Sequence, residues 1–395
     1  MRRPFTRVVW SPRSRTLSPP QPAFPDVGNS NWGPGLQPPT RAGRDHPARI
    51  HGLLRLTVLA LTCFFAAGVA RAQNMSLADL AFYAGPDRTE RLIAGAKREG
   101  SLTLYTSLTV DDMKVLGGAF EKKYGVKLNL WRSSSEDILQ RAVVEARGGR
   151  FDVDAIETSA AEMESLHREQ LLQEVKSPHL ADLSPAALLP HREWVGDRLN
   201  FITAAYNTNL VKKADLPKTY DDLLDPRWKG KLAIEADDSI WFGALVTALG
   251  EEKGLKLFRA LARGNGLTRR KGHTLIANLL ASGEVPFAIT TYQYRIEQMK
   301  KSGAPVDWLM LPPGITRFLG TGVLRHAPHP NAAILFLDFM LSDAQRLMLE
   351  RDITPTNIKV KPLDIQFKVI DPAEMLDEGG KWAKLFDEIV VKGGR

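Results

Sequence analysis

The sequence predicts an α/β protein of two lobes with a ligand cleft between them, and three observations lead to this fold class. Short apolar runs alternate with amphipathic stretches, which is typical of a mainly parallel sheet flanked by helices. The alternation occurs twice, in residues 101–172 and again in residues 220–292. The chain has 395 residues, which is enough for about two domains.

The first alternating region is expected to form three strands, each followed by a helix. Met113, Leu116 and Phe120 fall on one face of the first helix, and Ser133 with Glu136 forms a capping box at the start of the second. The expected elements are strands 101–107, 126–131 and 151–157, and helices 111–125, 133–149 and 159–172.

The second region repeats this pattern after an extended segment, 200–212, that leads from one lobe to the other. A long amphipathic helix, 331–350, is expected after this region. Its apolar run is interrupted by Asp338 and is too short to span a membrane. The expected elements of the second region are strands 231–236 and 285–292, and helices 239–250, 254–264 and 273–284.

We expect the second lobe to be inserted into the first, so that the chain crosses twice, near Tyr206–Asn207 and near residues 313–322. The expected parts are a disordered leader (1–48), a signal peptide (49–72), the first part of lobe 1 (73–205), lobe 2 (206–313) and a return to lobe 1 with C-terminal helices (314–395).

The formal charge of +8 lies wholly in residues 1–72, which hold ten arginines, no lysine and two aspartates. The remaining chain is balanced, so it has no basic surface typical of nucleic-acid binding. Residues 1–48 are rich in Pro, Gly, Ser and Arg, which favours disorder. A start codon assigned too far upstream explains why these residues precede a signal peptide.

The signal peptide is predicted from a basic start at Arg49 and Arg55, an apolar run and a small-x-small site ending at Ala72. We therefore expect cleavage after Ala72 and a periplasmic protein; a short membrane anchor is the alternative. Cys63, the only cysteine, lies in the apolar run, so the mature chain is expected to have no disulfide or thiol chemistry.

The ends of the first three predicted strands carry small hydroxyl side chains. The carboxyl ends of parallel strands form the ligand-binding edge of such sheets. Free backbone N–H groups at the start of the second helix would favour an anion at the same place; ordinary helix capping is the other interpretation. The candidate ligand-binding residues there are Thr106, Ser107, Ser133, Ser134, Ser135 and Thr158.

Several stretches, in this order, resemble the solute-binding receptors of bacterial ABC importers, specifically the branch with the ferric-ion-binding proteins. The most specific stretch is "DLLDPRWKGKLAI" (222–234). The others are "LTLYTS" (102–107), "LGGAFEKKYGVKLNLWRSSSEDIL" (116–139), "FDVDAIETSAAEM" (151–163), "AAYNTNLV" (204–211), "ASGEVPFAITTYQY" (281–294) and "HPNAAILFLDFMLSDAQ" (329–345).

The resemblance implies a periplasmic-binding-protein-like fold of type II that closes around a small ligand. In its iron-binding members, one histidine, one glutamate and two adjacent tyrosines hold the metal. Here the glutamate position is Glu157 and the first tyrosine Tyr292, but the histidine position falls near Thr109 and the second tyrosine on Gln293. The set is incomplete, so no metal and no cofactor is expected; a ferric site at Glu157 and Tyr292 is the alternative.

Other cleft candidates come from the second lobe. The resemblance implies that Asp238 and Ser239, which begin a helix, are candidates for ligand contact. Trp241, in the first turn of that helix, either forms a wall of the cleft or packs in the core of the lobe. Tyr292 ends a predicted strand facing the hinge, and Thr290 lies beside it. A carboxylate at Glu157 favours an amine, so a zwitterionic ligand stays open beside an anionic one.

The predicted function is an extracytoplasmic receptor for a small polar, anionic or zwitterionic solute. We expect a monomer that delivers its ligand to the permease and ATPase subunits of an ABC importer, and no nucleic-acid partner. The ligand-binding subunit of a sensor is an alternative. No enzyme is expected, because the sequence lacks the P-loop, dinucleotide-binding, zinc-protease and nucleophile-elbow motifs.

Overall fold

The computed structural model describes residues 75–363 and 367–393. The expected leader (1–48) and signal peptide (49–72), with the cleavage site after Ala72, therefore lie outside the described residues. Within the described ranges, no helix has both the length and the apolar character needed to cross a bilayer.

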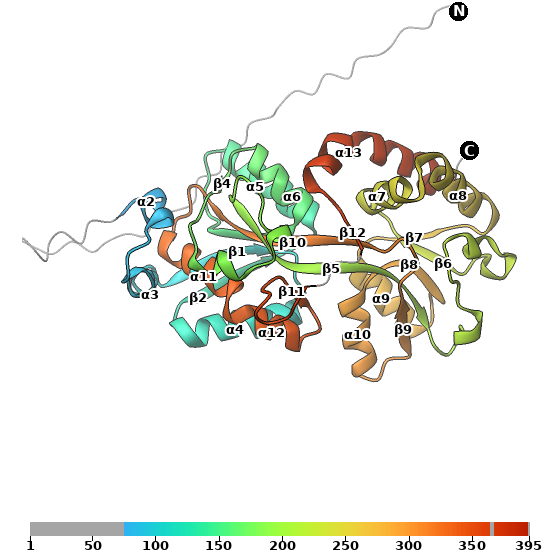
Figure 1. Ribbon diagram of the computed structural model, residues 1–395, viewed down its shortest axis with the longest axis horizontal. Helices are drawn as coiled ribbons and strands as arrows, with labels where there is room; N and C mark the ends of the chain where they lie inside the picture. The colour runs from blue at the N-terminus through green and yellow to red at the C-terminus, as the bar shows by residue number, and fades with distance from the viewer. Residues whose placement is uncertain (1–74, 364–366, 394–395) are drawn as a thin grey trace, which may run out of the picture. The chain divides into compact units, whose positions relative to one another are not determined.

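The strands form one mixed sheet that runs through the whole described chain (Figure 1). The order of its main strands is β2-β1-β3-β10-β5-β8-β6-β7. The strands are β1 (Ser101–Thr106), β2 (Lys127–Arg132), β3 (Ala155–Ser159), β4 (Leu172–Gln173), β5 (Trp194–Asn207), β6 (Leu232–Glu235), β7 (Thr268–Arg270), β8 (Phe287–Tyr292), β9 (Val306–Leu309), β10 (Ile315–Leu324), β11 (Thr354–Pro355) and β12 (Lys368–Val369).

Helices alternate with these strands, as the sequence predicts. The expected long helix 331–350 is two helices, because the chain leaves helical geometry at Ser342. The helices are α2 (Leu77–Phe82), α3 (Arg88–Glu99), α4 (Val110–Tyr124), α5 (Ser135–Arg147), α6 (Ala160–Arg168), α7 (Ser239–Leu249), α8 (Glu251–Gly264), α9 (His273–Ser282), α10 (Gln293–Lys301), α11 (Pro330–Leu341), α12 (Asp343–Glu350) and α13 (Pro372–Phe386).

The parallel strands β1, β2 and β3 end side by side. Thr106 at the end of β1 pairs with Arg132 of β2 and with Glu157 of β3. The segments that follow these strands therefore emerge at one edge of the sheet, as expected for an α/β protein. β3 continues two residues past its predicted end, to Ser159, so Glu157 lies inside the strand and not at its tip.

Separate apolar cores lie on the two halves of the sheet, which makes the protein two-lobed. The first core includes Leu199 of β5 and Phe318 of β10, whereas the second includes Ile202 of β5 and Ile315 of β10. The same two neighbouring antiparallel strands thus cross from one lobe to the other (Figure 1). A smaller third cluster packs α9 and α10 against the sheet.

The C-terminal helix α13 packs mainly on the second lobe, against α7, and also touches α6 of the first (Figure 1). Its buried Trp382 and Phe386 belong to the second core. The expectation had assigned residues 314–395 to the first lobe. The physical reason for the difference is Gly243 of α7, where an added Cβ would lie 2.5 Å from Cγ of Trp382; the missing side chain allows this close approach.

Replacing Gly243 with alanine should lower the free energy of unfolding by about 1–3 kcal/mol, because the new methyl group overpacks the contact with Trp382. The matched control is Gly379→Ala in α13, where nothing lies within 4 Å of the new Cβ. That change should raise stability by about 0.5–1 kcal/mol. Urea denaturation measures both; shifts of the same sign would contradict the packing argument.

Candidate functional site

A cavity of about 580 Å³ opens where the two lobes meet. Its walls come from the first lobe, from the second lobe and from the crossing strands β5 and β10. Volumes of this size are typical of sites for small organic molecules and exceed what one metal ion fills. The polar, charged and aromatic residues that line it include Ser107, Ser133, Ser134, Ser135, Ser159, Glu162, Arg198, Asn200, Glu235, Asp238, His273, Tyr292, Tyr294, Arg295 and Arg317.

Half of the residues predicted for ligand binding line this cavity. They come from the segments after β1 and β2 and from the second lobe. The fold therefore brings together side chains that lie as far apart in the sequence as positions 107 and 292. The predicted residues that line the cavity are Ser107, Ser133, Ser134, Ser135, Asp238 and Tyr292.

Three other predicted residues, Thr106, Glu157 and Thr158, are fully buried beneath the cavity. Thr106 Oγ1 donates to Glu157 Oε2 at 2.5 Å, and the guanidinium of Arg198 forms an ion pair with Glu157. The carboxylate at the position of the family's iron ligand thus already has a counter-charge. Arg198 also pairs with Asp197, and burial raises the pKa of Asp197 to about 7.

The remaining predicted residues of the second lobe also lie away from the cavity wall. Trp241 is fully buried in the second core, 5.9 Å from the ring of Phe258, so the core interpretation describes its position. Thr290 Oγ1 is buried and accepts a hydrogen bond from the backbone N–H of Glu235 at 3.1 Å. Ser239 is the first residue of α7, and it does not line the cavity, whereas the N-cap residue before it, Asp238, does.

The side chains of the serine loop, residues 133–135, hydrogen-bond with other groups of the protein. Ser134 caps α5 by accepting from the backbone N–H of Asp137 at 3.2 Å, and Ser133 Oγ donates to the Asp137 carboxylate at 2.7 Å. Ser135 Oγ lies 2.9 Å from Ser159 Oγ. Because Glu136 and Asp137 already place negative charge in the first turn, the start of α5 is a weaker anion site than the sequence indicated.

Tyr292 lies close to several other side chains of the cavity wall. Its hydroxyl contacts the guanidinium of Arg317, and its ring lies 4.1 Å from the ring of His273 and 6.1 Å from that of Tyr294. Burial raises the pKa of Tyr292 to about 12, so the phenol is protonated at neutral pH. The tyrosine pair therefore presents a phenol held by an arginine, and not a pair of phenolates.

Arg317 lies among oppositely charged groups without an ion pair to any described carboxylate. Burial lowers the pKa of its guanidinium, but interactions with Tyr292, Asp238 and Glu162 outweigh burial and raise it. Burial raises the pKa of Asp238 to about 6 and that of Glu162 to about 7, and the charge of Arg317 opposes both shifts. The cavity thus places the fixed positive charge of Arg317 near two carboxylates whose pKa values lie near neutrality.

At the cavity, Glu235, Asp238 and His273 bring three potential metal-ligand atoms within 4.8 Å of one another. Both Glu235 oxygens, however, accept backbone N–H groups, from Gly272 at 2.8 Å and from Asp237 at 2.7 Å. Burial, together with the charge of Arg317, lowers the pKa of His273 to about 4, although the charge of Glu235 opposes this shift. With both Glu235 oxygens already accepting hydrogen bonds, these residues fit a metal ion poorly.

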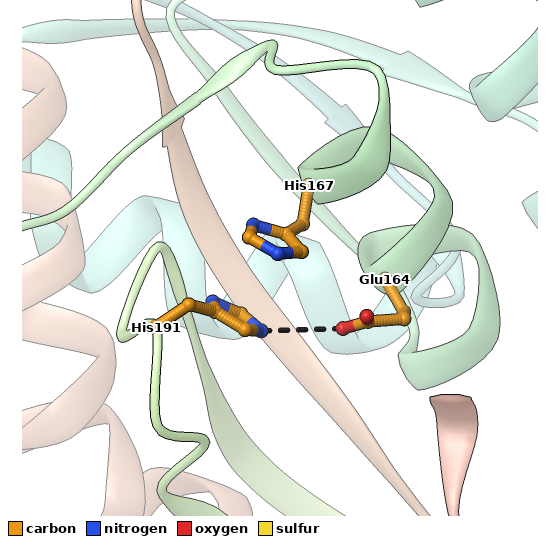
Figure 2. A group of neighbouring side chains, drawn as sticks. All are labelled: Glu164, His167 and His191. Carbon is orange, nitrogen blue, oxygen red and sulfur yellow. Dashed lines mark hydrogen bonds and ion pairs between the residues drawn. The ribbon is translucent and has the colours of Figure 1, made fainter. Parts of the chain in front are cut away.

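A second group, Glu164, His167 and His191, lies outside the cavity (Figure 2). His191 Nδ1 accepts from the backbone N–H of Glu193 at 3.1 Å, so its Nε2 carries the proton and donates to Glu164 at 3.2 Å. The two imidazole rings stack 3.8 Å apart at 12°, so their nitrogen lone pairs do not converge on one point. This arrangement is a hydrogen-bonded pair and does not present a formed metal site.

The sequence analysis missed the charged residues that give the cavity its character: Arg198, Arg317, Glu162 and His273. A signal for the two arginines exists, since each is a charged residue inside a mainly uncharged strand, "WVGDRLNF" and "ITRFLGTGVL", where only Asp197 is also charged. Buried charges in strands need partners, so such residues point to an ion pair or a ligand. No comparable signal marks Glu162, because an acidic residue in the first turn of a helix is common.

Comparisons with known proteins agree with this architecture. The Fe(3+)-binding periplasmic protein of Serratia marcescens is 25% identical over 254 residues, which cover 62% of this chain and 75% of that protein. Iron uptake protein A2 of Synechocystis sp. is 28% identical over 313 residues, covering 72% and 87%.

The structure of the periplasmic binding protein AfuA from Actinobacillus pleuropneumoniae, with exogenous fructose-6-phosphate bound, superposes with a TM-score of 0.65. It is 21% identical and covers 74% of this chain and 99% of that one, which shows a shared fold. The sequence profile of the bacterial extracellular solute-binding proteins matches residues 157–375, more than half of the chain. The chain is therefore a member of the bacterial extracellular solute-binding protein family.

Proposed function

We propose that this solute-binding protein is the periplasmic receptor of an ABC importer and that its ligand is a small organic anion or zwitterion. A signal peptide cleaved after Ala72 would direct it to the periplasm, and it would act as a monomer that hands its ligand to the permease and ATPase subunits. The observation that carries the ligand class is Arg317, a partly buried guanidinium in the cavity that makes no ion pair with a described carboxylate.

The position of Arg317 supports an oxyanion ligand for a physical reason. Its Nε is buried and has no hydrogen-bond partner among the described residues, and the same holds for Nε of Arg295 on the cavity wall. Buried donors of a cationic group are costly unless an acceptor reaches them. A carboxylate, sulfonate or phosphate group is the acceptor that best matches a guanidinium.

A ferric ion is the second candidate ligand, because two matched relatives are named for iron binding or iron uptake. The local chemistry favours it less. Glu157 is paired with Arg198, and the hydroxyl of Tyr292 contacts Arg317. An iron site built on these two residues would have to break both contacts and place a trivalent cation beside two guanidinium groups.

The test is a thermal-shift and calorimetric screen of residues 73–395, purified under conditions that remove bound ligand. The probes are β-alanine, propionate, taurine, ethanesulfonate and ferric citrate. A ligand at 100 times its Kd stabilises the protein by about 2.7 kcal/mol, so binding raises the melting temperature measurably. Binding of an organic anion or zwitterion supports the proposal. A visible iron–tyrosinate absorption band with ferric citrate, and no response to the organic probes, would refute it.

A further inference from the structure

Two carboxylates from different lobes reach the cavity beside Arg317. Glu162 lies in the first turn of α6 in the first lobe, and Asp238 is the N-cap residue of α7 in the second. Only 8% of Glu162 and 4% of Asp238 is exposed. Glu162 Oε2 and Asp238 Oδ2 are buried without a hydrogen-bond partner among the described residues. The cavity therefore offers unpartnered acceptors as well as unpartnered donors.

The nearest groups do not neutralise this pair of carboxylates. His273 Nε2 lies 3.6 Å from Asp238 Oδ2, but the buried imidazole is neutral at pH 7 because burial lowers its pKa to about 4. Glu136 on the cavity wall adds a further negative charge that acts on both Glu162 and Asp238. Arg317 is thus the principal cation that acts on both carboxylates.

The sign of these charges discriminates between ligand classes. A simple anion that pairs with Arg317 would compete with Glu162 and Asp238 and leave their oxygens without donors. A simple cation would leave the guanidinium without an acceptor. A molecule with an ammonium group and an oxyanion satisfies both sets, and buried charges are stable only when they are paired.

We propose, resting on the function proposed above, that the cleft selects a zwitterion whose oxyanion pairs with Arg317 and whose ammonium group is held between Glu162 and Asp238. The two carboxylates belong to different lobes, so the ammonium group joins the lobes when it binds. The ligand's cationic centre then determines selectivity, while the oxyanion supplies a contact that many solutes could make.

The pH dependence of binding separates this arrangement from its main rival. If protonated carboxyl groups donate to a plain anion, affinity rises as the pH falls; if ionised carboxylates hold an ammonium group, affinity falls. Burial places both carboxyl pKa values near neutrality, at about 7 for Glu162 and about 6 for Asp238. The charged or titratable groups that act on them are Arg317, Glu136, Asp237, Glu235, His273 and Tyr292.

The experiment compares matched probes whose own charges change little in this pH range: β-alanine against propionate, and taurine against ethanesulfonate. Calorimetry at about pH 8 should show at least one zwitterion binding on the order of 10-fold or more tightly than its amine-free partner. Its affinity should fall on the order of 10-fold when the pH is lowered to about 5.5. Both readouts use the unmodified protein, so they do not depend on whether a variant folds.

Variants then assign the preference to residues. Glu162→Gln and Asp238→Asn should each reduce the zwitterion-to-anion affinity ratio on the order of 10-fold and flatten the pH dependence. Glu164→Gln is the matched control, since Glu164 is a buried carboxylate on the same helix outside the cavity; it should keep the ratio. A melting temperature for each variant shows that it is folded.

The outcomes distinguish the two proposals. If propionate or ethanesulfonate binds as tightly as its amine-bearing partner, or affinity rises as the pH falls, the zwitterion inference is overturned while the anion receptor stands. If ferric citrate binds with a visible absorption band and no organic probe binds, both proposals fall. If none of the probes shifts the melting temperature, the zwitterion inference is likewise overturned.

Discussion

Replacing Arg198 with methionine should lower the free energy of unfolding by about 3–5 kcal/mol, the largest stability effect that the structure predicts. Arg198 is 2% exposed and pairs with Glu157 and Asp197, which are both fully buried. Methionine fills a similar volume but leaves two carboxylates without a counter-charge in the centre of the sheet. Urea denaturation followed by circular dichroism measures the change.

Two further variants show whether charge is the cause. In the Arg198→Met background, Glu157→Gln should recover part of the lost stability, because it removes one of the two unpaired charges. Arg147→Met breaks the exposed ion pair with Glu169, where the arginine side chain is 70% exposed, and should change stability little. Equal losses for Arg198→Met with and without Glu157→Gln would show that packing, and not charge, explains the effect.

Replacing Arg317 with glutamine should weaken binding of the tightest organic probe on the order of 100-fold, which corresponds to about 2.7 kcal/mol. The reason is that we propose the partly buried guanidinium as the donor to the ligand's oxyanion, and glutamine keeps a donor but no charge. Isothermal titration calorimetry measures the affinity, and the melting temperature without ligand reports folding.

Arg325→Gln is the matched control for this prediction. Arg325 directly follows the strand that carries Arg317, and its guanidinium donates to the carbonyl of Leu172 at 2.9 Å, away from the cavity. This variant should keep the affinity of the unmodified protein. An Arg317→Gln protein that binds every organic probe as tightly as the control would exclude Arg317 as the anion-binding residue.

Much of the fold follows from local patterns in the sequence. The predicted strand 101–107 corresponds to β1 (Ser101–Thr106), and the predicted helix 239–250 corresponds to α7 (Ser239–Leu249). The first alternates apolar and polar residues, the second is a long apolar run, and clear end signals such as Gly250 after α7 bound them. Such signals are local, so they can be interpreted from the sequence without knowledge of the tertiary structure.

The candidate site was less predictable, because it depends on side-chain directions and on contacts that are distant in sequence. The predicted strand 151–157 ends two residues too early, which placed Glu157 at a strand tip when it pairs inside the sheet with Thr106 and Thr321. The pairing of Glu157 with Arg198 spans two elements that no local pattern connects. Helical spacing alone cannot tell whether Trp241 faces the cleft or the core.

The crossing strands β5 and β10 have a consequence for motion. They pair with each other as they pass between the lobes, so any rotation of one lobe against the other must bend both strands together. The β5–β10 ladder shifts register between Leu319 and Gly320, and the β5–β8 ladder shifts register between Thr203 and Ala205; we expect bending to concentrate at these irregular places. We expect these two paired strands to resist bending when the lobes close. Part of the free energy of ligand binding would then be offset by deformation of the backbone, and this strain would be relieved when the ligand dissociates.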